Sequence, residues 1–192
     1  MAVVEADSPL SWRWRLPRAT LGLALVHRPT DAEHDHGQEL LAAVSAVVLR
    51  RGHNLCDLPI VNVYLARERA RRVDRDDALP LMRAAVDHLF REGRLLLHSD
   101  TARGVLVGTL LDRRADGDVL EAEAAIARLA AAPTDDGVAV RDIWLLRMRA
   151  LLARALGDEA AYRDDWDRYR TMETSLGFEG HMEWAGRCHD CG

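Results

Sequence analysis

Hydrophobic residues recur at helical spacing along most of the chain, most clearly between residues 138 and 178. The pattern predicts two antiparallel helices there, one ending at Leu156 and one running from Glu159 to Leu176. One side of the second helix carries large apolar residues at steps of three and four: Tyr162, Trp166, Tyr169, Met172 and Leu176. Because an isolated helix of about 18 residues is marginal in water, we expect this stripe to pack against a partner helix rather than to line a ligand groove.

The same two-helix pattern occurs twice more in the preceding residues. It predicts helices over residues 58–73, 77–91, 101–114 and 118–131. The pairs repeat at an offset of 40 residues, so that Val86 falls on Ile126 and Ile126 on Trp166. Equivalent positions that stay apolar while changing size are typical of stacked helical hairpins. We therefore predict an all-α fold, a tetratricopeptide-like array of antiparallel helical hairpins (an α-solenoid), although its period exceeds the usual ~34 residues.

The ends of the chain are less regular than its middle. We predict a partly helical N-terminal segment, a helical-repeat domain and a frayed tail, over residues 1–37, 38–186 and 187–192 respectively. A short helix over residues 178–186 would close the repeat domain by covering the last hairpin.

Near the N-terminus the helix signals are weaker. Pro17 could open a helix at its first turn. The polar residues 30–37 form a loop or the start of a helix, in which Thr30 and Glu33 have the spacing of a capping box. An alanine- and leucine-rich helix is predicted over residues 38–51. Paired with the apolar residues 19–26, this helix would form a divergent fourth unit, because three of its residues keep the repeat offset: Ala42, Ala46 and Leu49.

Composition excludes several function classes. All 26 basic residues are arginines, and the absence of lysine rules out a Walker-type phosphate loop and a Schiff-base lysine. A net charge of −5 argues against nucleic-acid binding. The arginines clustered over residues 67–75 are followed by aspartates, which favours a solvated helix end of mixed charge.

The sequence also predicts where the protein resides. No apolar run approaches the ~20 residues of a membrane span, and the first residues lack the pattern of a secretory signal. The three cysteines, an odd number, fit reduced thiols better than a disulfide framework. We therefore expect a cytoplasmic protein that does not associate with membranes.

Cysteine and histidine supply the candidates for a metal or redox site. Cys188-His189-Asp190-Cys191 offers two thiolates, but a structural zinc site takes four ligands and the sequence contains no second pair of this kind. His34 and His36 form a His-x-His pair, which in a polar stretch is more often solvated than metal-bound. We therefore predict no metal, no cofactor and no catalytic residue, with five weak candidates for metal binding: Cys188, Cys191, His189, His34 and His36.

Four segments resemble the C-terminal helical-repeat region of large bacterial class III adenylate cyclases and ATPase-type transcriptional regulators. They comprise residues 55–72, 118–133, 143–147 and 175–181, and the likeness extends over about residues 42–184. In that family the tetratricopeptide-like helices follow a cyclase domain and an ATPase-like domain. The resemblance implies no catalytic residue here, because the metal-binding aspartates and the phosphate loop of the family lie in domains that have no counterpart in this sequence.

These observations together predict a non-catalytic protein. The leading hypothesis is a protein–protein interaction or regulatory module that binds a protein partner, or a second copy of itself, through a concave face or an exposed end. The alternative is a small-molecule or metal sensor that uses the groove or the Cys and His clusters. Cyclase activity is a remote third hypothesis, because the phosphate and metal chemistry it needs is missing from the sequence.

Overall fold

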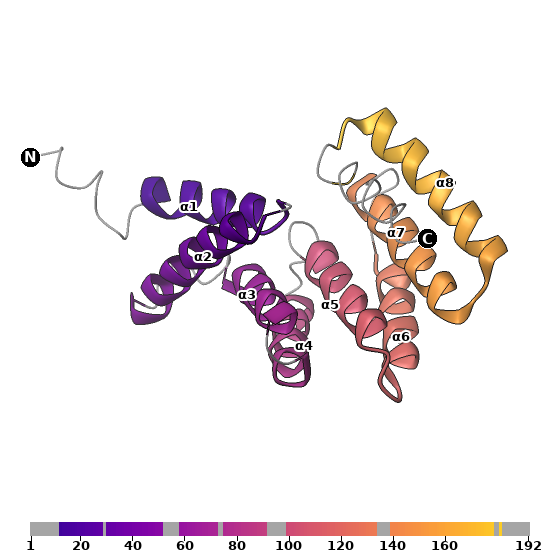
Figure 1. Cartoon of the computed structure of the whole chain (residues 1–192), viewed down its shortest axis with the longest axis horizontal. Helices are drawn as coiled ribbons and strands as arrows, with labels where there is room; N and C mark the ends of the chain where they lie inside the picture. The colour runs from indigo at the N-terminus through magenta and orange to yellow at the C-terminus, as the bar shows by residue number, and fades with distance from the viewer. Residues whose placement is uncertain are drawn as a thin grey trace, which may run out of the picture. The chain divides into compact units, whose positions relative to one another are not determined.

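The chain folds into helices (Figure 1). The computed structural model describes residues 12–28, 30–51, 58–72, 75–91, 99–133, 139–178 and 181. Within these ranges there are eight α-helices and no strand, so the predicted all-α class is confirmed. None of the described helices is long and apolar enough to cross a membrane.

The helices form two compact units, Met1–Val105 and Leu106–Gly192, whose boundary falls inside α5. Their bounds are α1 Trp12–Leu25, α2 Asp31–Arg51, α3 Leu58–Arg72, α4 Arg75–Arg91, α5 Ser99–Arg113, α6 Asp118–Ala131, α7 Ala139–Leu156 and α8 Glu159–Leu176. The bounds of α6 and α8 agree with the prediction, and those of α3, α4 and α5 differ from it by one or two residues. The predicted helix over 178–186 lies outside the described residues, except for Phe178 and His181.

The start of the chain differs from the prediction at two points. Pro17 lies inside α1 and not in its first turn, because this helix already begins at Trp12. α2 begins at Asp31 and not at residue 38. The hydroxyl oxygen of Thr30 accepts the backbone N–H of Glu33 at 3.3 Å, and the hydroxyl donates to the Glu33 carboxylate at 2.7 Å. The predicted pairing of Thr30 with Glu33 is thus confirmed, and it starts the helix seven residues earlier than expected.

In the first unit, α1 packs on α2, α2 on α3, and α3 on α4. α4 shows why such packing is required: its buried residues recur at steps of three and four and form one stripe, whereas Leu81, Asp87 and Phe90 are exposed. The stripe consists of Leu79, Met82, Val86 and Leu89. Covering a stripe of this kind removes apolar surface from water, at roughly 25 cal/mol per Å².

The contact between α1 and α2 is close because two glycines meet there. A Cβ atom added to Gly37 would lie 2.9 Å from the carbonyl oxygen of Gly22, and one added to Gly22 would lie 3.1 Å from the carbonyl oxygen of Gly37. The first distance is shorter than real Cβ contacts allow, and the second is tighter than most of them. Gly37 is therefore accommodated inside α2 despite the low helix propensity of glycine.

In the second unit, α6 packs on α7, and α7 on α8. The buried Asp118 holds the turn before α6. Its carboxylate oxygens lie 2.5 Å and 2.9 Å from two guanidinium nitrogens of Arg113, and one of them accepts a hydrogen bond from the backbone N–H of Ala115 at 2.9 Å. At the other end of α6, the buried guanidinium of Arg141 donates to the carbonyl oxygens of Leu129 and Ala130. Side chains thus satisfy backbone groups that a helix end leaves without partners.

Three residues that the 40-residue offset places at equivalent positions are buried. Val86, Ile126 and Trp166 lie in the cores of their units. The stripe on α8 is only partly covered: Trp166 and Tyr169 are buried, but Leu176 is 39% exposed, so the expectation that it packs is wrong for this residue. The predicted fourth unit agrees with the structure in its pairing, since α1 packs on α2, but Ala42 and Leu49 are exposed where the repeat offset places buried residues.

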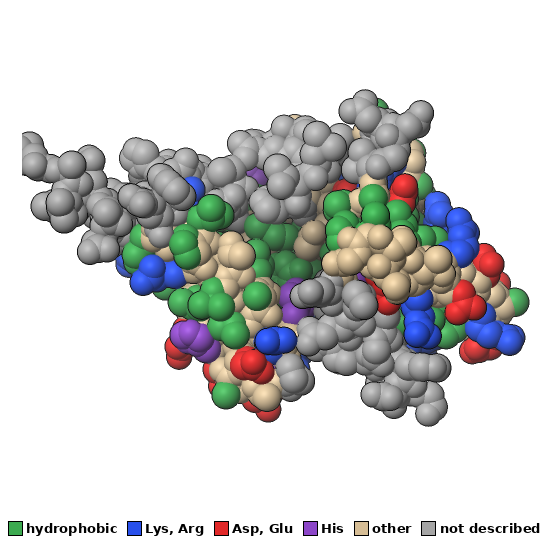
Figure 2. All heavy atoms as spheres, turned by 90° about the horizontal axis from the view of Figure 1, so that it is seen from above, with side chains coloured by type: hydrophobic (Ala, Val, Ile, Leu, Met, Phe, Trp, Pro, Cys, Tyr) green, Lys and Arg blue, Asp and Glu red, His purple; other side chains and the backbone are tan. Residues whose placement is uncertain are grey.

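Charged side chains of both signs lie side by side on the described surface. In the space-filling view of Figure 2, basic and acidic side chains alternate, and hydrophobic side chains reach the surface between them. On this face the described residues form no extended basic area of the kind that neutralises nucleic-acid phosphates.

The close approach of α1 and α2 leads to a first prediction. Gly37→Ala should lower the free energy of unfolding by about 1–3 kcal/mol, because the added methyl group must push two helix backbones apart. Gly108→Ala is the matched control: it lies within α5 with open space around the added methyl group, and should raise the stability by about 0.5–1 kcal/mol. Urea unfolding of both variants measures the difference. Equal stabilities would contradict the close contact.

Candidate binding site

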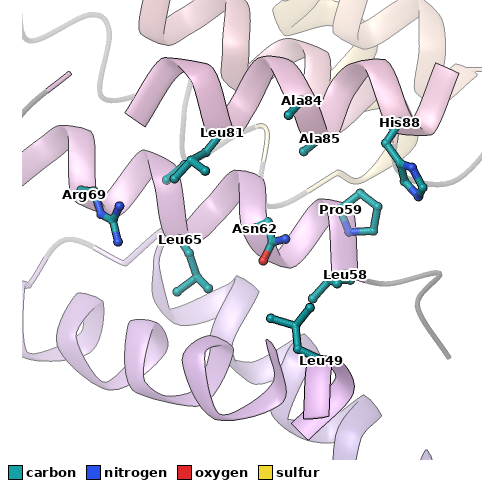
Figure 3. Close-up of a pocket in the computed structure, with 11 residues that line it drawn as sticks. Leu49, Leu58, Pro59, Asn62, Leu65, Arg69, Leu81, Ala84, Ala85 and His88 are labelled. Carbon is teal, nitrogen blue, oxygen red and sulfur yellow. The ribbon is translucent and has the colours of Figure 1, made fainter. Parts of the chain in front are cut away.

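A pocket of about 550 Å³ opens in the first unit between α2, α3 and α4 (Figure 3). We call it the α3–α4 pocket, since these two helices supply all but one of its lining residues. They are Leu49 from α2; Leu58, Pro59, Asn62, Leu65, Ala66 and Arg69 from α3; and Leu81, Ala84, Ala85 and His88 from α4.

The pocket arises because α3 is apolar on two sides. Its buried core residues include Ile60, Val61 and Tyr64. The pocket uses a different stripe at steps of four, three and four: Leu58, Asn62, Leu65 and Arg69. Leu65 is half-buried and faces the pocket.

Two leucines leave much of their surface exposed at this site. Leu49 is 61% exposed and Leu81 is 47% exposed. A single exposed leucine is ordinary on a protein surface, but several leucines around one concave site are not explained by the folding of the unit. The α3–α4 pocket therefore has the composition of a binding site, mostly apolar with a few polar groups.

The polar side chains of the pocket are Asn62, Arg69 and His88, and none of its lining residues is acidic. The carbonyl oxygen of Asn62 accepts a hydrogen bond from the Ser45 hydroxyl at 3.3 Å, which leaves the amide nitrogen available as a donor. In Figure 3, Arg69 and Leu81 lie toward one end of the pocket, and His88 lies with Leu58 and Pro59 toward the other.

The two arginines that flank Arg69 in the sequence are engaged elsewhere. Arg67 donates to the carbonyl oxygen of Val26 at 3.5 Å and lies 3.3 Å from the ring of His27. Arg71 lies 3.2 Å from the carboxylate of Asp31. Arg67 is half-buried against the end of α1, so the predicted solvated helix end is wrong for this residue. Arg71 and its partner Asp31 are both exposed, which agrees with the predicted solvated end of mixed charge.

A buried hydrogen bond between side chains joins α2 to α3. Nδ1 of His34 lies 2.9 Å from a carboxylate oxygen of Glu68, and Nε of Arg71 lies 3.4 Å from the same oxygen. Both His34 and Glu68 are buried. A buried carboxylate requires such partners, because desolvation without them would cost several kcal/mol. His34 is thus a packed helix residue, and its assignment to a solvated pair was wrong.

Among the described residues, no three His, Cys, Asp or Glu side chains come together in a group that could hold a metal ion. His34 is committed to Glu68, and the exposed His36 lies 4.0 Å from the carboxylate of Glu39. The remaining candidates, Cys188, His189 and Cys191, lie outside the described residues.

The aromatic residues of α8 form a packed cluster in the second unit. The Trp166 ring lies 5.7 Å from that of Tyr162 and 5.3 Å from that of Tyr169, between ring centroids. The Tyr169 hydroxyl lies 2.9 Å from Nδ1 of His181, and Trp144 meets the His181 ring edge-on at 5.0 Å. Trp166 and Tyr169 thus contribute to the core, as predicted, although Tyr162 is only half-buried.

Two ionisable groups of this unit were not identified from the sequence. Burial raises the pKa of Glu173, against the opposing effect of Arg170. Burial also lowers the pKa of His181, with help from the Arg147 guanidinium, to about 4. Glu173 follows Trp166 and Tyr169 at steps of three and four, so its spacing places it on the buried side of α8, but its charge kept it out of the predicted apolar stripe. His181 lies beyond the C-terminus of α8, where helical spacing gives no sign of burial.

Glu173 leads to a second prediction. Its folded pKa lies above the unfolded value, so the folded state binds a proton more strongly and stability is lost as pH rises through the folded pKa. Glu173→Gln should therefore raise stability at pH 7, with the gain disappearing below the unfolded pKa of 4.5. Urea unfolding at pH 4 and pH 7 tests this, with the exposed Glu123→Gln as control. A gain of the same size at both pH values would contradict it.

His181 leads to a third prediction, of opposite sign. Its folded pKa of about 4 lies below the unfolded value of 6.5, so only the unfolded chain takes up the proton between these values. The second unit should lose up to about 3 kcal/mol of stability as pH falls from 6.5 to 4. His181→Asn should flatten this part of the pH profile, measured by denaturant unfolding. An unchanged profile in the variant would refute the assignment.

Comparisons with known proteins add no relative to this picture. No protein-family model, no curated protein and no solved structure matches the chain. A function has to be inferred from the side chains of the chain itself, and among the described residues the α3–α4 pocket offers the most direct basis.

Proposed function

We propose that the chain is a non-catalytic interaction module that binds a helical segment of a protein partner in the α3–α4 pocket. The observation that carries this proposal is the exposure of Leu49 and Leu81 at the mouth of one apolar pocket. Apolar side chains of a partner would remove this surface from water, which supplies the free energy of association.

The shape of the lining suits a helix. The residues that α3 contributes run from Leu58 to Arg69, a length of about 16 Å at the rise of an α-helix. Such a length accommodates about three turns of a partner helix, which would place apolar residues at i, i+4 and i+7 into the pocket. The side chains of α3 and α4 form ridges on both sides, and a third helix can pack between them.

We extend the proposal to the architecture. The hairpins would stack as a tetratricopeptide-like array, as in the helical-repeat regions of adenylate cyclase-type signalling proteins that the sequence resembles. The burial of Val86, Ile126 and Trp166 at 40-residue steps supports this, as does the pairing of α3 with α4 and of α7 with α8. The module would then act in signalling by holding a partner, or a second copy of itself, without performing chemistry.

A small-molecule sensor is the second candidate, and one observation favours it. A volume of about 550 Å³ lies within the usual range of ligand pockets, and three polar groups stand among apolar walls. The exposed leucines favour the protein partner, because a small ligand enclosed by the pocket would leave much of Leu49 in water.

Site-specific cross-linking tests the proposed function. A photoreactive amino acid in place of Leu49 should cross-link a partner in cells of the source organism. The same label in place of Leu120, which is 71% exposed on α6, should give no product of that mass. Adding Leu81→Arg to the Leu49-labelled chain should reduce the yield about tenfold, since a charge at the mouth opposes apolar contacts. A product of twice the chain mass would identify the partner as a second copy.

Two outcomes would count against the proposed function. Equal cross-linking yields from positions 49 and 120 would show that the photoreactive label cross-links non-specifically. A yield from position 49 that Leu81→Arg leaves unchanged would show that the partner does not occupy the α3–α4 pocket.

A further inference from the structure

We infer that the α3–α4 pocket selects an acidic helix: the segment that occupies it carries a carboxylate that pairs with Arg69. This inference rests on the proposed function and adds the chemical class of the partner. It follows from the charge of the lining residues, from the state of Arg69, and from the arrangement of polar and apolar groups along the pocket.

The pocket is cationic on an acidic protein. The whole chain carries 31 acidic residues against 26 arginines, yet none of the acidic residues lines the pocket. The polar groups that do line it are the guanidinium of Arg69, the free amide nitrogen of Asn62 and the imidazole of His88. The first two can only donate hydrogen bonds, so the complementary ligand is an acceptor, and a carboxylate is the strongest acceptor that a protein partner offers.

Arg69 is ready to pair with such a ligand. Its side chain is exposed, and within the described ranges it makes no hydrogen bond or ion pair, unlike Arg67 and Arg71. The two neighbours stabilise the contact of α3 with α2 and with the end of α1. Arg69 projects on the pocket side, where it contributes nothing to this packing.

The guanidinium of Arg69 stands at one end of the pocket, and leucines follow it along α3 with Asn62 between them. From Arg69 the stripe on α3 continues through Leu65 and Asn62 to Leu58, with Leu81 opposite its Arg69 end (Figure 3). An amphipathic helix with an acidic residue at position i and leucines at i+4, i+8 and i+11 reproduces this order. Because the leucines would exclude water around the Arg69 contact, the ion pair would be stronger than one on an open surface.

Three synthetic peptides serve as the probe. Each is an alanine-rich helix of about 15 residues with leucines at the three positions above, and they differ only at position i, which holds Glu, Gln or Arg. Binding to the full chain is measured by fluorescence anisotropy. We expect the Glu peptide to bind about three- to tenfold more tightly than the Gln peptide, and the Arg peptide to bind most weakly.

Charge reversal on the protein provides the decisive comparison. In Arg69→Glu the order of the peptides should invert, so that the Arg peptide binds best. Arg168→Glu is the matched control, since it makes the same charge change at an exposed position of α8 in the other unit, and should preserve the original order. Binding of the Arg peptide to the Arg69→Glu variant would show that this variant is folded.

The failures of this inference and of the proposed function can be told apart. If the three peptides bind equally, or keep their order in Arg69→Glu, the acidic selectivity is overturned; the proposed function still stands if Leu81→Arg abolishes their binding. If none of them binds the unmodified chain, the inference is overturned, and cross-linking from position 49 decides the proposed function separately. If dodecanoate binds in an Arg69-dependent way and the Glu peptide does not bind, the inference of an acidic helix is overturned in favour of a small amphiphilic ligand.

Discussion

Each unit of this protein depends on helices covering one another's apolar stripes. The stripe of α4 between Leu79 and Leu89 would be exposed on an isolated helix, and so would Trp166 and Tyr169 on α8. Helices of 14 to 21 residues have little stability of their own in water. The pairing of α1 with α2, of α3 with α4, and of α7 with α8 is therefore what makes these helices stable.

Buried polar groups then fix which residues meet. Glu68 can be buried only because His34 and Arg71 approach it, and Asp118 only because Arg113 does. Arg141 joins α7 to the C-terminal end of α6 through backbone carbonyl groups. A shifted register would leave a charge without its partner, so such groups favour one alignment of the helices, whether or not they add net stability.

The sequence predicted helices well where chemistry marks their ends. α6 and α8 were placed correctly because Gly117 and Gly177 adopt positive φ angles next to strong periodic patterns. α2 was predicted too short because Gly37 suggested a break. Gly37 lies inside the helix since α1 leaves no room for a side chain there, and this depends on a contact with Gly22 that no local pattern reveals.

The pocket was harder to predict than the fold. In the sequence Arg67, Arg69 and Arg71 are equivalent residues of one cluster. Only the positions of His27 and Asp31, about 40 residues away, separate the two arginines that have partners from Arg69. Leu65 likewise has the spacing of a core residue, but α3 has more apolar surface than its neighbours cover. Residues that face the core are constrained by packing, whereas Arg69 and Leu81 are exposed and Leu65 is only half-buried. The sequence pattern marks positions that must be covered for the unit to fold, and it carries no comparable mark for the residues of a pocket.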